Sequence, residues 1–332
     1  MAQRGSESAT PLMSAAPGPG GAAVASRDGG LARQRRPLTL SAWAERHIGA
    51  LLALPAVLLI LALTAYPLAY SLWVAFVNYD FLVPGHAFVG LRNFAQVVTD
   101  PVAQSALLVT IVLSVLSVTV EFLLGLGLAL LMERPLAGRG LVTSVLIIPL
   151  FISPVIVGQF WALLLQRPFG PVDYLLGKLL GHPVTIDWLS AFPWNFVALV
   201  MADAWQWTPF MFVILLAGLT ALPHEPYEAA MIDGVNGWQA FRYITLPQLV
   251  PMILLAITFR LLDAVKLFDT IFMMTGGGPG TSTYTASFYL YETGFQHFHL
   301  SEATAGSWIF LLLTAAAITL LVRRLLRAGA ER

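Results

Sequence analysis

Long apolar runs are the feature that most restricts how this chain of 332 residues can fold. A helix needs roughly 20 apolar residues to cross about 30 Å of hydrocarbon. In lipid each run must be helical, because a helix satisfies its backbone N–H and C=O groups within one segment. Six runs qualify, and they cover residues 49–76, 105–132, 141–165, 196–221, 250–275 and 303–323. The sequence therefore predicts an all-α polytopic membrane protein with six transmembrane helices, which form one domain over residues 46–327.

The composition agrees with a membrane protein and excludes several other classes. Only 11% of the residues are charged, against about 25% in a typical soluble domain. The formal net charge of zero gives no sign of nucleic-acid binding, and the absence of Cys excludes disulfides and cysteine-ligated metals. Residues 1–45 are rich in Gly, Ala, Ser and Pro, so we interpret them as a disordered cytoplasmic tail and not as a signal peptide.

The distribution of Lys and Arg predicts the orientation of the spans. With the N-terminus in the cytoplasm, six spans put thirteen of the 18 basic residues inside and three in external loops. Basic residues concentrate on the cytoplasmic side of membrane proteins, so we expect both termini there. The fifth run is the weakest, because four charged residues interrupt it. A five-span alternative would move Arg323, Arg324 and Arg327 outside, which the same rule disfavours.

The segment between the fourth and fifth runs, residues 222–249, is a cytoplasmic loop with its own helical pattern. The residues from Glu228 to Asp233 are mostly good helix formers, and Gly234 permits the left-handed backbone that ends a helix. A second short helix is predicted from Trp238 to Tyr243, and Pro247 is expected to restart the chain into the fifth span. The pattern fits an ordinary loop, a hairpin on the bilayer surface, or a hairpin docked into a groove of a partner protein.

Charged side chains inside predicted spans mark a second region. Inserting a charge at mid-bilayer costs about 2.5–3.5 kcal/mol, so each one is either functional or paired. The candidates are Glu121, Asp203, Arg260, Asp263, Lys266 and Asp269. Each of the last four lies three residues from the next, the spacing of neighbours on a helix surface, so that successive members could neutralise one another. Alternatively, Asp203, Arg260 and Asp263 line a polar cavity.

The residues that follow Asp203 suit recognition of a neutral polyol. Carboxylates and amides accept and donate hydrogen bonds to hydroxyl groups, and aromatic rings cover the apolar face of a sugar. The stretch Asp203-Ala204-Trp205-Gln206-Trp207-Thr208-Pro209-Phe210 supplies both kinds of group. Its Pro209 lacks a backbone donor and frees a carbonyl within the span. The tryptophans could equally be packing or interfacial residues.

Three motifs resemble one known family. The loop carries Glu-Ala-Ala, three residues, Gly, nine residues, Ile, one residue and Leu-Pro, over Glu228 to Pro247. This pattern is similar to the loop signature of permease subunits of binding-protein-dependent ABC importers. The segments 88–94 (Phe-Val-Gly-Leu-Arg-Asn-Phe) and 275–279 (Thr-Gly-Gly-Gly-Pro) resemble the maltose, trehalose and glycerol-phosphate branch of that family. The segments 117–122 and 260–264 are similar to trehalose permeases.

The resemblance implies two sets of site residues. The loop would form the coupling helices that seat in a cleft of a separate ATPase subunit, through Glu228, Ala229, Ala230, Asp233, Gly234, Ile244, Leu246 and Pro247. The sugar site of the branch lies at mid-membrane between the fourth and fifth spans. Its contact positions fall on Asp203, Gln206, Trp207, Phe210, Arg260, Asp263, Ala264 and Leu267. Most of these side chains differ from the maltose pattern, which leaves the sugar open.

The resemblance also implies a type I ABC importer permease in the bacterial inner membrane. The expected partners are a second, similar permease, two copies of an ATPase, and an external solute-binding protein. No catalytic residue, metal site or cofactor is expected in this chain. Gly276 to Gly280 lack the Gly-Lys-Ser/Thr of a phosphate loop, so ATP and magnesium would bind to the ATPase. The alternatives are a glycerol-phosphate permease, an ion-driven secondary transporter, and a membrane scaffold or sensor that transports nothing.

Overall fold

The computed structural model describes residues 40–79, 85–133, 138–168 and 170–330. Most of the predicted tail, residues 1–39, lies outside the described residues, and α1 begins at Leu40. The described chain is helical and has no strand, apart from an isolated antiparallel bridge between Val77 and Phe88. It divides into two units, residues up to Ile60 and residues from Leu61 onward, and α1 runs from the first into the second. Every helix after α1 lies in the second unit.

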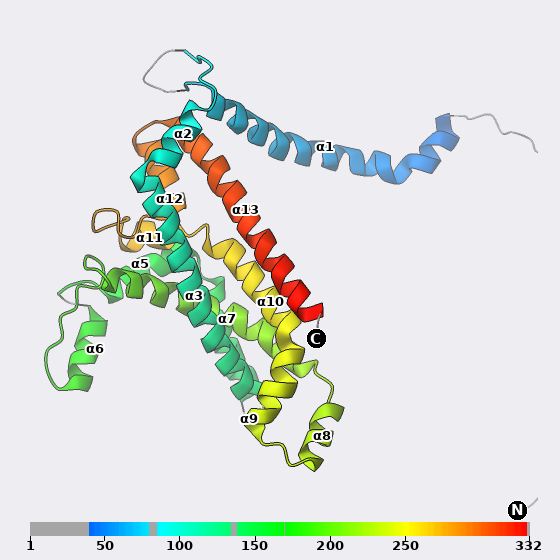
Figure 1. The fold of residues 1–332 in the computed structure, drawn as a ribbon, viewed down its shortest axis with the longest axis vertical. Coiled ribbons are helices and arrows are strands. Elements are labelled where there is room, and N and C mark those ends of the chain that lie inside the picture. The colour runs from blue at the N-terminus through cyan, green and yellow to red at the C-terminus, as the bar shows by residue number, and fades with distance from the viewer. Residues whose placement is uncertain (1–39, 80–84, 134–137, 169, 331–332) are drawn as a thin grey trace, which may run out of the picture. The chain divides into compact units, whose positions relative to one another are not determined.

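The helices follow one another without a sheet. Their bounds are α1 (Leu40–Phe76), α2 (Arg92–Thr99), α3 (Pro101–Glu133), α4 (Arg139–Ile147), η1 (Ile148–Phe151), α5 (Pro154–Leu164), α6 (Pro171–Leu180), α7 (Trp194–Thr220), α8 (Glu225–Ile232), α9 (Gly237–Ala240), η2 (Phe241–Thr245), α10 (Leu246–Ala264), α11 (Asp269–Met274), α12 (Ala286–Tyr291), η3 (Glu292–Gln296) and α13 (Leu300–Ala330). Figure 1 shows α8 and α9 at the opposite end of this unit from α2 and α12.

Within the described ranges, five helices are long and apolar enough to cross a membrane, and a sixth span is counted if one bent pair is taken together. The five are 52–76, 101–133, 194–220, 237–264 and 300–320. The sixth is the pair Arg139–Phe151 and Pro154–Leu164, which is bent by 99°. The third predicted span, residues 141–165, is therefore two helices and not one.

Two prolines explain the bend in the third span. Pro149 lies in the short 3₁₀ helix η1, and Pro154 begins α5. Because the residue before a proline is pushed out of the helical region, Ser153 is extended, with ψ of 136°. The preceding Ile152 is extended as well, with ψ of 135°, so that two residues separate the helices.

The fifth span begins and ends earlier than the hydropathy predicts. Helix α9 continues through the π-helical turn η2 into α10, so that residues 237–264 form one helix of 28 residues. Pro247 was expected to restart the chain, but it lies in the first turn of α10 and the helix is unbroken. The N–H of Leu246 bonds to the carbonyl of Phe241, five residues back, which widens the helix just before the proline.

Close backbone contacts join α3, α7 and α10. A Cβ atom on Gly125 of α3 would lie 2.6 Å from the Cβ of Met211 on α7. A Cβ on Gly218 of α7 would lie 2.8 Å from side-chain atoms of Leu249 and Met252 on α10. Membrane helices associate through small residues because lipid offers no hydrophobic force between them. These glycines therefore set the short spacing of the three helices that carry the charged residues.

Candidate functional site

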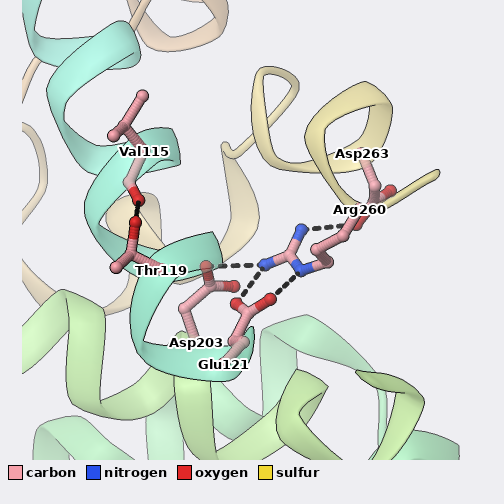
Figure 2. Close-up of polar contacts among 6 residues, drawn as sticks. All are labelled: Val115, Thr119, Glu121, Asp203, Arg260 and Asp263. Carbon is pink, nitrogen blue, oxygen red and sulfur yellow. Dashed lines mark hydrogen bonds and ion pairs between the residues drawn. The ribbon is translucent and has the colours of Figure 1, made fainter. Parts of the chain in front are cut away.

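Arg260 lies at the centre of a buried cluster of charges between three helices (Figure 2). Its Nε donates to Oε2 of Glu121 at 2.7 Å, and its Nη2 donates to Oε1 of the same carboxylate at 3.0 Å. The same Nη2 donates to Oδ2 of Asp203 at 2.6 Å. Because Glu121 is on α3, Asp203 on α7 and Arg260 on α10, the cluster ties the three helices together.

One side of the guanidinium faces a more open region. Nη1 donates to Oδ2 of Asp263 at 3.2 Å, and the Asp263 side chain is 52% exposed, whereas that of Arg260 is 1% exposed. The guanidinium carbon lies 4.8 Å from the centre of the Trp207 ring, a cation–π distance. Four of the five N–H groups of an arginine are thus used, and one ring covers the cation.

The cluster contains more negative than positive groups. Three carboxylates surround one guanidinium, and two of them, on Glu121 and Asp203, are 0% and 2% exposed. Desolvation makes such a cluster a poor source of net stability, but removing one partner leaves an uncompensated charge and is strongly destabilising. The arrangement therefore fixes geometry: it holds Arg260 in one orientation and leaves the carboxylate of Asp263 facing outward.

Gln206 takes part in a contact that its predicted role did not include. Its side chain is buried, and Nε2 donates to the carbonyl of Ile152 at 2.8 Å. That carbonyl belongs to the break between η1 and α5, where the extended backbone leaves it without a helical partner. Gln206 thus fastens the bent third span to α7.

The aromatic residues of the predicted stretch lie on two faces of α7. Trp207 and Phe210 are partly exposed, and their rings meet edge to face with centres 6.3 Å apart. Trp205 lies on the other face, where it and Trp161 line an apolar cavity of about 940 Å³ bounded by α3, α4, α5 and α7. The remaining two predicted positions pack in the interior: Ala264 is 2% exposed, and Leu267 is half-buried against a core cluster.

Lys266 and Asp269 lie outside the cluster. Both are exposed, and α10 ends at Ala264, so the predicted ladder of charges does not continue along one helix. In the described part of the chain, the ion pairs involve neither residue.

The loop between α7 and α10 forms a helical hairpin. Helix α8 ends at Ile232, and Gly234 has a φ of +74°, the left-handed conformation that reverses the chain. Asn236 then caps α9: its side chain accepts from the N–H of Gln239, and the Gln239 side chain accepts from the N–H of Asn236. The hydroxyl of Tyr227 donates to Oγ1 of Thr245 at 3.0 Å, which joins α8 to η2.

The hairpin exposes apolar surface around a concavity. Met231, Ile232, Trp238 and Tyr243 are each at least 70% exposed. Beside them is a hollow of about 590 Å³, lined by Pro226, Ala229, Ala230, Asp233, Gly234, Val235, Gln239, Tyr243 and Ile244. Of the predicted coupling residues, Glu228, Ala229, Asp233 and Gly234 are exposed, Ala230 is buried, and Ile244, Leu246 and Pro247 are half-buried. Large exposed apolar patches mark interaction surfaces.

The helices are those of a multi-pass membrane protein, with a charged cluster inside the bundle and a helical hairpin at one end. Comparison with protein families gives the particular class. Residues 121–330 match the family described as the inner membrane component of binding-protein-dependent transport systems. The chain belongs to this family: it is a permease subunit of an ABC transporter and not an enzyme, since the ATPase of these systems is a separate subunit.

Relatives of the chain cover most of its length. It is 40% identical over 278 residues to a probable ABC transporter permease, y4oQ, of Sinorhizobium fredii, spanning 83% of this chain and 89% of that protein. It is 35% identical to the trehalose/maltose permease MalF of Thermococcus litoralis, over 81% of this chain and 89% of that protein. It is also 35% identical to the trehalose permease SugA of Mycobacterium tuberculosis, over 88% and 92%.

More distant proteins of other stated cargo share the fold. The sn-glycerol-3-phosphate permease UgpA of Agrobacterium fabrum is 31% identical, over 80% of this chain and 90% of that protein. A chain of a bacterial alginate ABC transporter, solved in complex with an alginate-bound periplasmic protein, superposes with a TM-score of 0.74. It is 25% identical, over 87% of this chain and 97% of that chain. The resemblance expected from the sequence motifs is thus confirmed at the level of the family and its carbohydrate permease branch.

Sequence reasoning did not pair Arg260 with Glu121. Glu121 was noted as a charge inside a span, but its carboxylate meets the guanidinium from 139 residues away. The signal that could have paired them is the cost of leaving either charge alone in a membrane. That cost predicts that each buried charge has a partner, but it does not identify the partner residue.

Proposed function

We propose that this chain forms half of a translocation pathway for a neutral sugar, a disaccharide such as trehalose, in an ATP-driven importer. The named trehalose permeases among its relatives support this cargo, each at 35% identity over more than four-fifths of the chain. The glycerol-phosphate and alginate transporters are relatives that handle anions. The choice between neutral and anionic cargo therefore depends on the site itself.

The observation that supports a neutral cargo is that Arg260 is buried and bonded to carboxylates of the chain itself. An anionic cargo would need a cation to pair with. Arg260 is 1% exposed, and four of its N–H groups are bonded to carboxylates of the chain. The exposed charge of the cluster is instead the carboxylate of Asp263. A carboxylate accepts hydrogen bonds from sugar hydroxyls and repels anions.

We assign different roles to the eight predicted substrate positions. Asp263, Trp207 and Phe210 have exposed surface, and these would contact the sugar through one carboxylate and two rings. Asp203, Gln206 and Arg260 are buried and would position those three. Ala264 and Leu267 would pack behind them.

The exposed hairpin is proposed to couple the chain to its ATPase. Glu228, Ala229, Asp233, Gly234 and the exposed apolar side chains around the hollow suit a groove on a cytoplasmic partner. In this scheme both termini are cytoplasmic, and ATP and magnesium bind only to the ATPase dimer. A second permease supplies the other half of the pathway, and an external binding protein delivers the sugar. ATP binding opens the pathway outward, and hydrolysis returns it inward.

The test is the ATPase activity of the reconstituted complex, titrated with its binding protein and a panel of trehalose, maltose and glycerol phosphate. Stimulation by one neutral sugar supports the proposal and identifies the cargo. Stimulation by glycerol phosphate alone would refute the neutral-sugar cargo but would still support an ATP-driven importer. Uptake that persists without ATP but collapses with an uncoupler would favour an ion-driven transporter, and no uptake of any solute would favour a scaffold.

A further inference from the structure

Glu121 is the most deeply buried carboxylate of the cluster around Arg260. Glu121 is 0% exposed and lies on α3, while the partly exposed Trp207, Phe210 and Asp263 lie on α7 and α10. Its carboxylate is bonded to two nitrogens of Arg260, at 2.7 and 3.0 Å. No other side chain of the described cluster holds the guanidinium through two bonds.

We propose that Glu121 is a positioning residue that makes the site select neutral over anionic sugars, by holding the charge of Arg260 away from the cargo. This inference rests on the proposed function, and it concerns how the same site discriminates among sugars.

The bidentate contact fixes the direction of the guanidinium. An arginine fork matched to a carboxylate is held in plane by two parallel hydrogen bonds. With Nε and one hydrogen of Nη2 bound to Glu121, Nη1 donates to Asp263 and the guanidinium carbon lies over the Trp207 ring. The carboxylate of Asp263 therefore lies between the guanidinium and the exposed region, and its negative charge screens the positive charge of Arg260.

The same contact sets the charge balance of the site. Removing the charge of Glu121 leaves two carboxylates, on Asp203 and Asp263, around the guanidinium. The guanidinium then keeps at most one of the two acceptors that point it into the bundle, because a glutamine offers a single carbonyl oxygen. Its positive charge becomes available beside the exposed Asp263, and repulsion of an anion at that point decreases. Discrimination against anions depends on such repulsive elements.

The experiment uses the transporter assembled from both permeases and an ATPase variant that binds but does not hydrolyse ATP. The binding protein is left out, because it binds the sugar itself. Labelled trehalose is bound to this complex in detergent. Unlabelled trehalose and trehalose 6-phosphate then compete with it, and the ratio of their affinities is the readout. A merely structural defect lowers the amount of active complex but does not change this ratio.

Glu121→Gln keeps the shape of the side chain and removes its charge. We expect the ratio to move toward the phosphate by about tenfold, the size that roughly 1.4 kcal/mol produces. If this variant does not assemble, Glu121→Asp shortens the reach of the carboxylate, and a smaller shift in the same direction is expected. Asp269→Asn is the matched control, because it removes an exposed carboxylate outside the cluster, and its ratio should be that of the natural complex.

A double variant identifies the cation responsible. Glu121→Gln with Arg260→Gln removes both charges of the pair, and the gain for trehalose 6-phosphate should disappear. The inference is overturned if assembled Glu121 variants keep the natural ratio, or if the gain persists in the double variant. A natural complex that binds phosphate and no neutral sugar overturns the proposed function, and this inference with it. Natural trehalose binding with unchanged ratios in the variants overturns the inference alone.

Discussion

Replacing Arg260 by Met should destabilise the protein far more than the same change at an exposed arginine. The side chains of Glu121 and Asp203, 0% and 2% exposed, would lose their counter-charge. Breaking a buried pair by removing one partner costs about 3–5 kcal/mol. Since each kcal/mol shifts a melting temperature by about 2–4 °C in domains of 150–250 residues, we expect a fall of about 10 °C.

The matched control is Arg167→Met. Arg167 pairs with Asp187 at 3.6 Å, and the two side chains are 47% and 40% exposed. A solvent-exposed pair contributes at most about 1 kcal/mol after screening, so the melting temperature should fall by no more than about 3 °C. Both changes remove the same charge and leave a similar side-chain volume.

The assay is thermal unfolding of the purified protein in detergent, followed by the fluorescence of its nine tryptophans. A third variant, Glu121→Met with Asp203→Leu and Arg260→Met, replaces all three buried charges by apolar side chains. It should recover most of the loss, because replacing a whole buried cluster is often nearly neutral. Equal shifts for the two single variants, or no recovery in the triple variant, would refute the reasoning.

Two further predictions concern glycines with matched controls. Gly125→Ala should lower the melting temperature and weaken the packing of α3 on α7, because the new Cβ would lie 2.6 Å from the Cβ of Met211. Gly127→Ala, on the same helix with nothing within 4 Å, should leave the melting temperature nearly unchanged, and similar falls would contradict this view. Gly234→Val should abolish uptake while membrane insertion remains normal, because φ is +74° at the turn of the hairpin. Gly138→Val imposes the same strain at a φ of +78° in a different loop, and uptake there should persist; equal losses would show that strain alone is responsible.

Hydropathy predicts where the chain crosses the membrane better than where each helix begins and ends. Apolar runs indicate burial in lipid, and four of the five long helices follow them within a few residues at both ends. The third run reads as one span because its prolines are apolar, although Pro149 and Pro154 mark the bend. For the fifth run, hydropathy places the start of the helix too late. The less apolar segment from Gly237 to Thr245 belongs to the hairpin but is continuous with the same helix.

The charged cluster was only partly predictable. The i, i+3 spacing correctly suggests that Arg260 can reach Asp263 on its own helix. The contacts with Glu121 and Asp203 depend on how α3, α7 and α10 cross, and a single sequence holds no information on that geometry. Gln206 illustrates the same limit, because its partner is a carbonyl that becomes free only where the third span bends.

The unbroken helix from Gly237 to Ala264 has a mechanical consequence. Trp238, on the exposed hairpin, and Arg260, in the buried cluster, stand on the same rod about 22 residues apart, or roughly 33 Å at 1.5 Å per residue. A tilt of the hairpin end, transmitted along this helix, would displace Arg260 and Asp263. The guanidinium would then be pulled against Glu121 and Asp203, whose helices must follow or release it. A movement of the hairpin would in this way change the ion pairs of Arg260 at the other end of the helix.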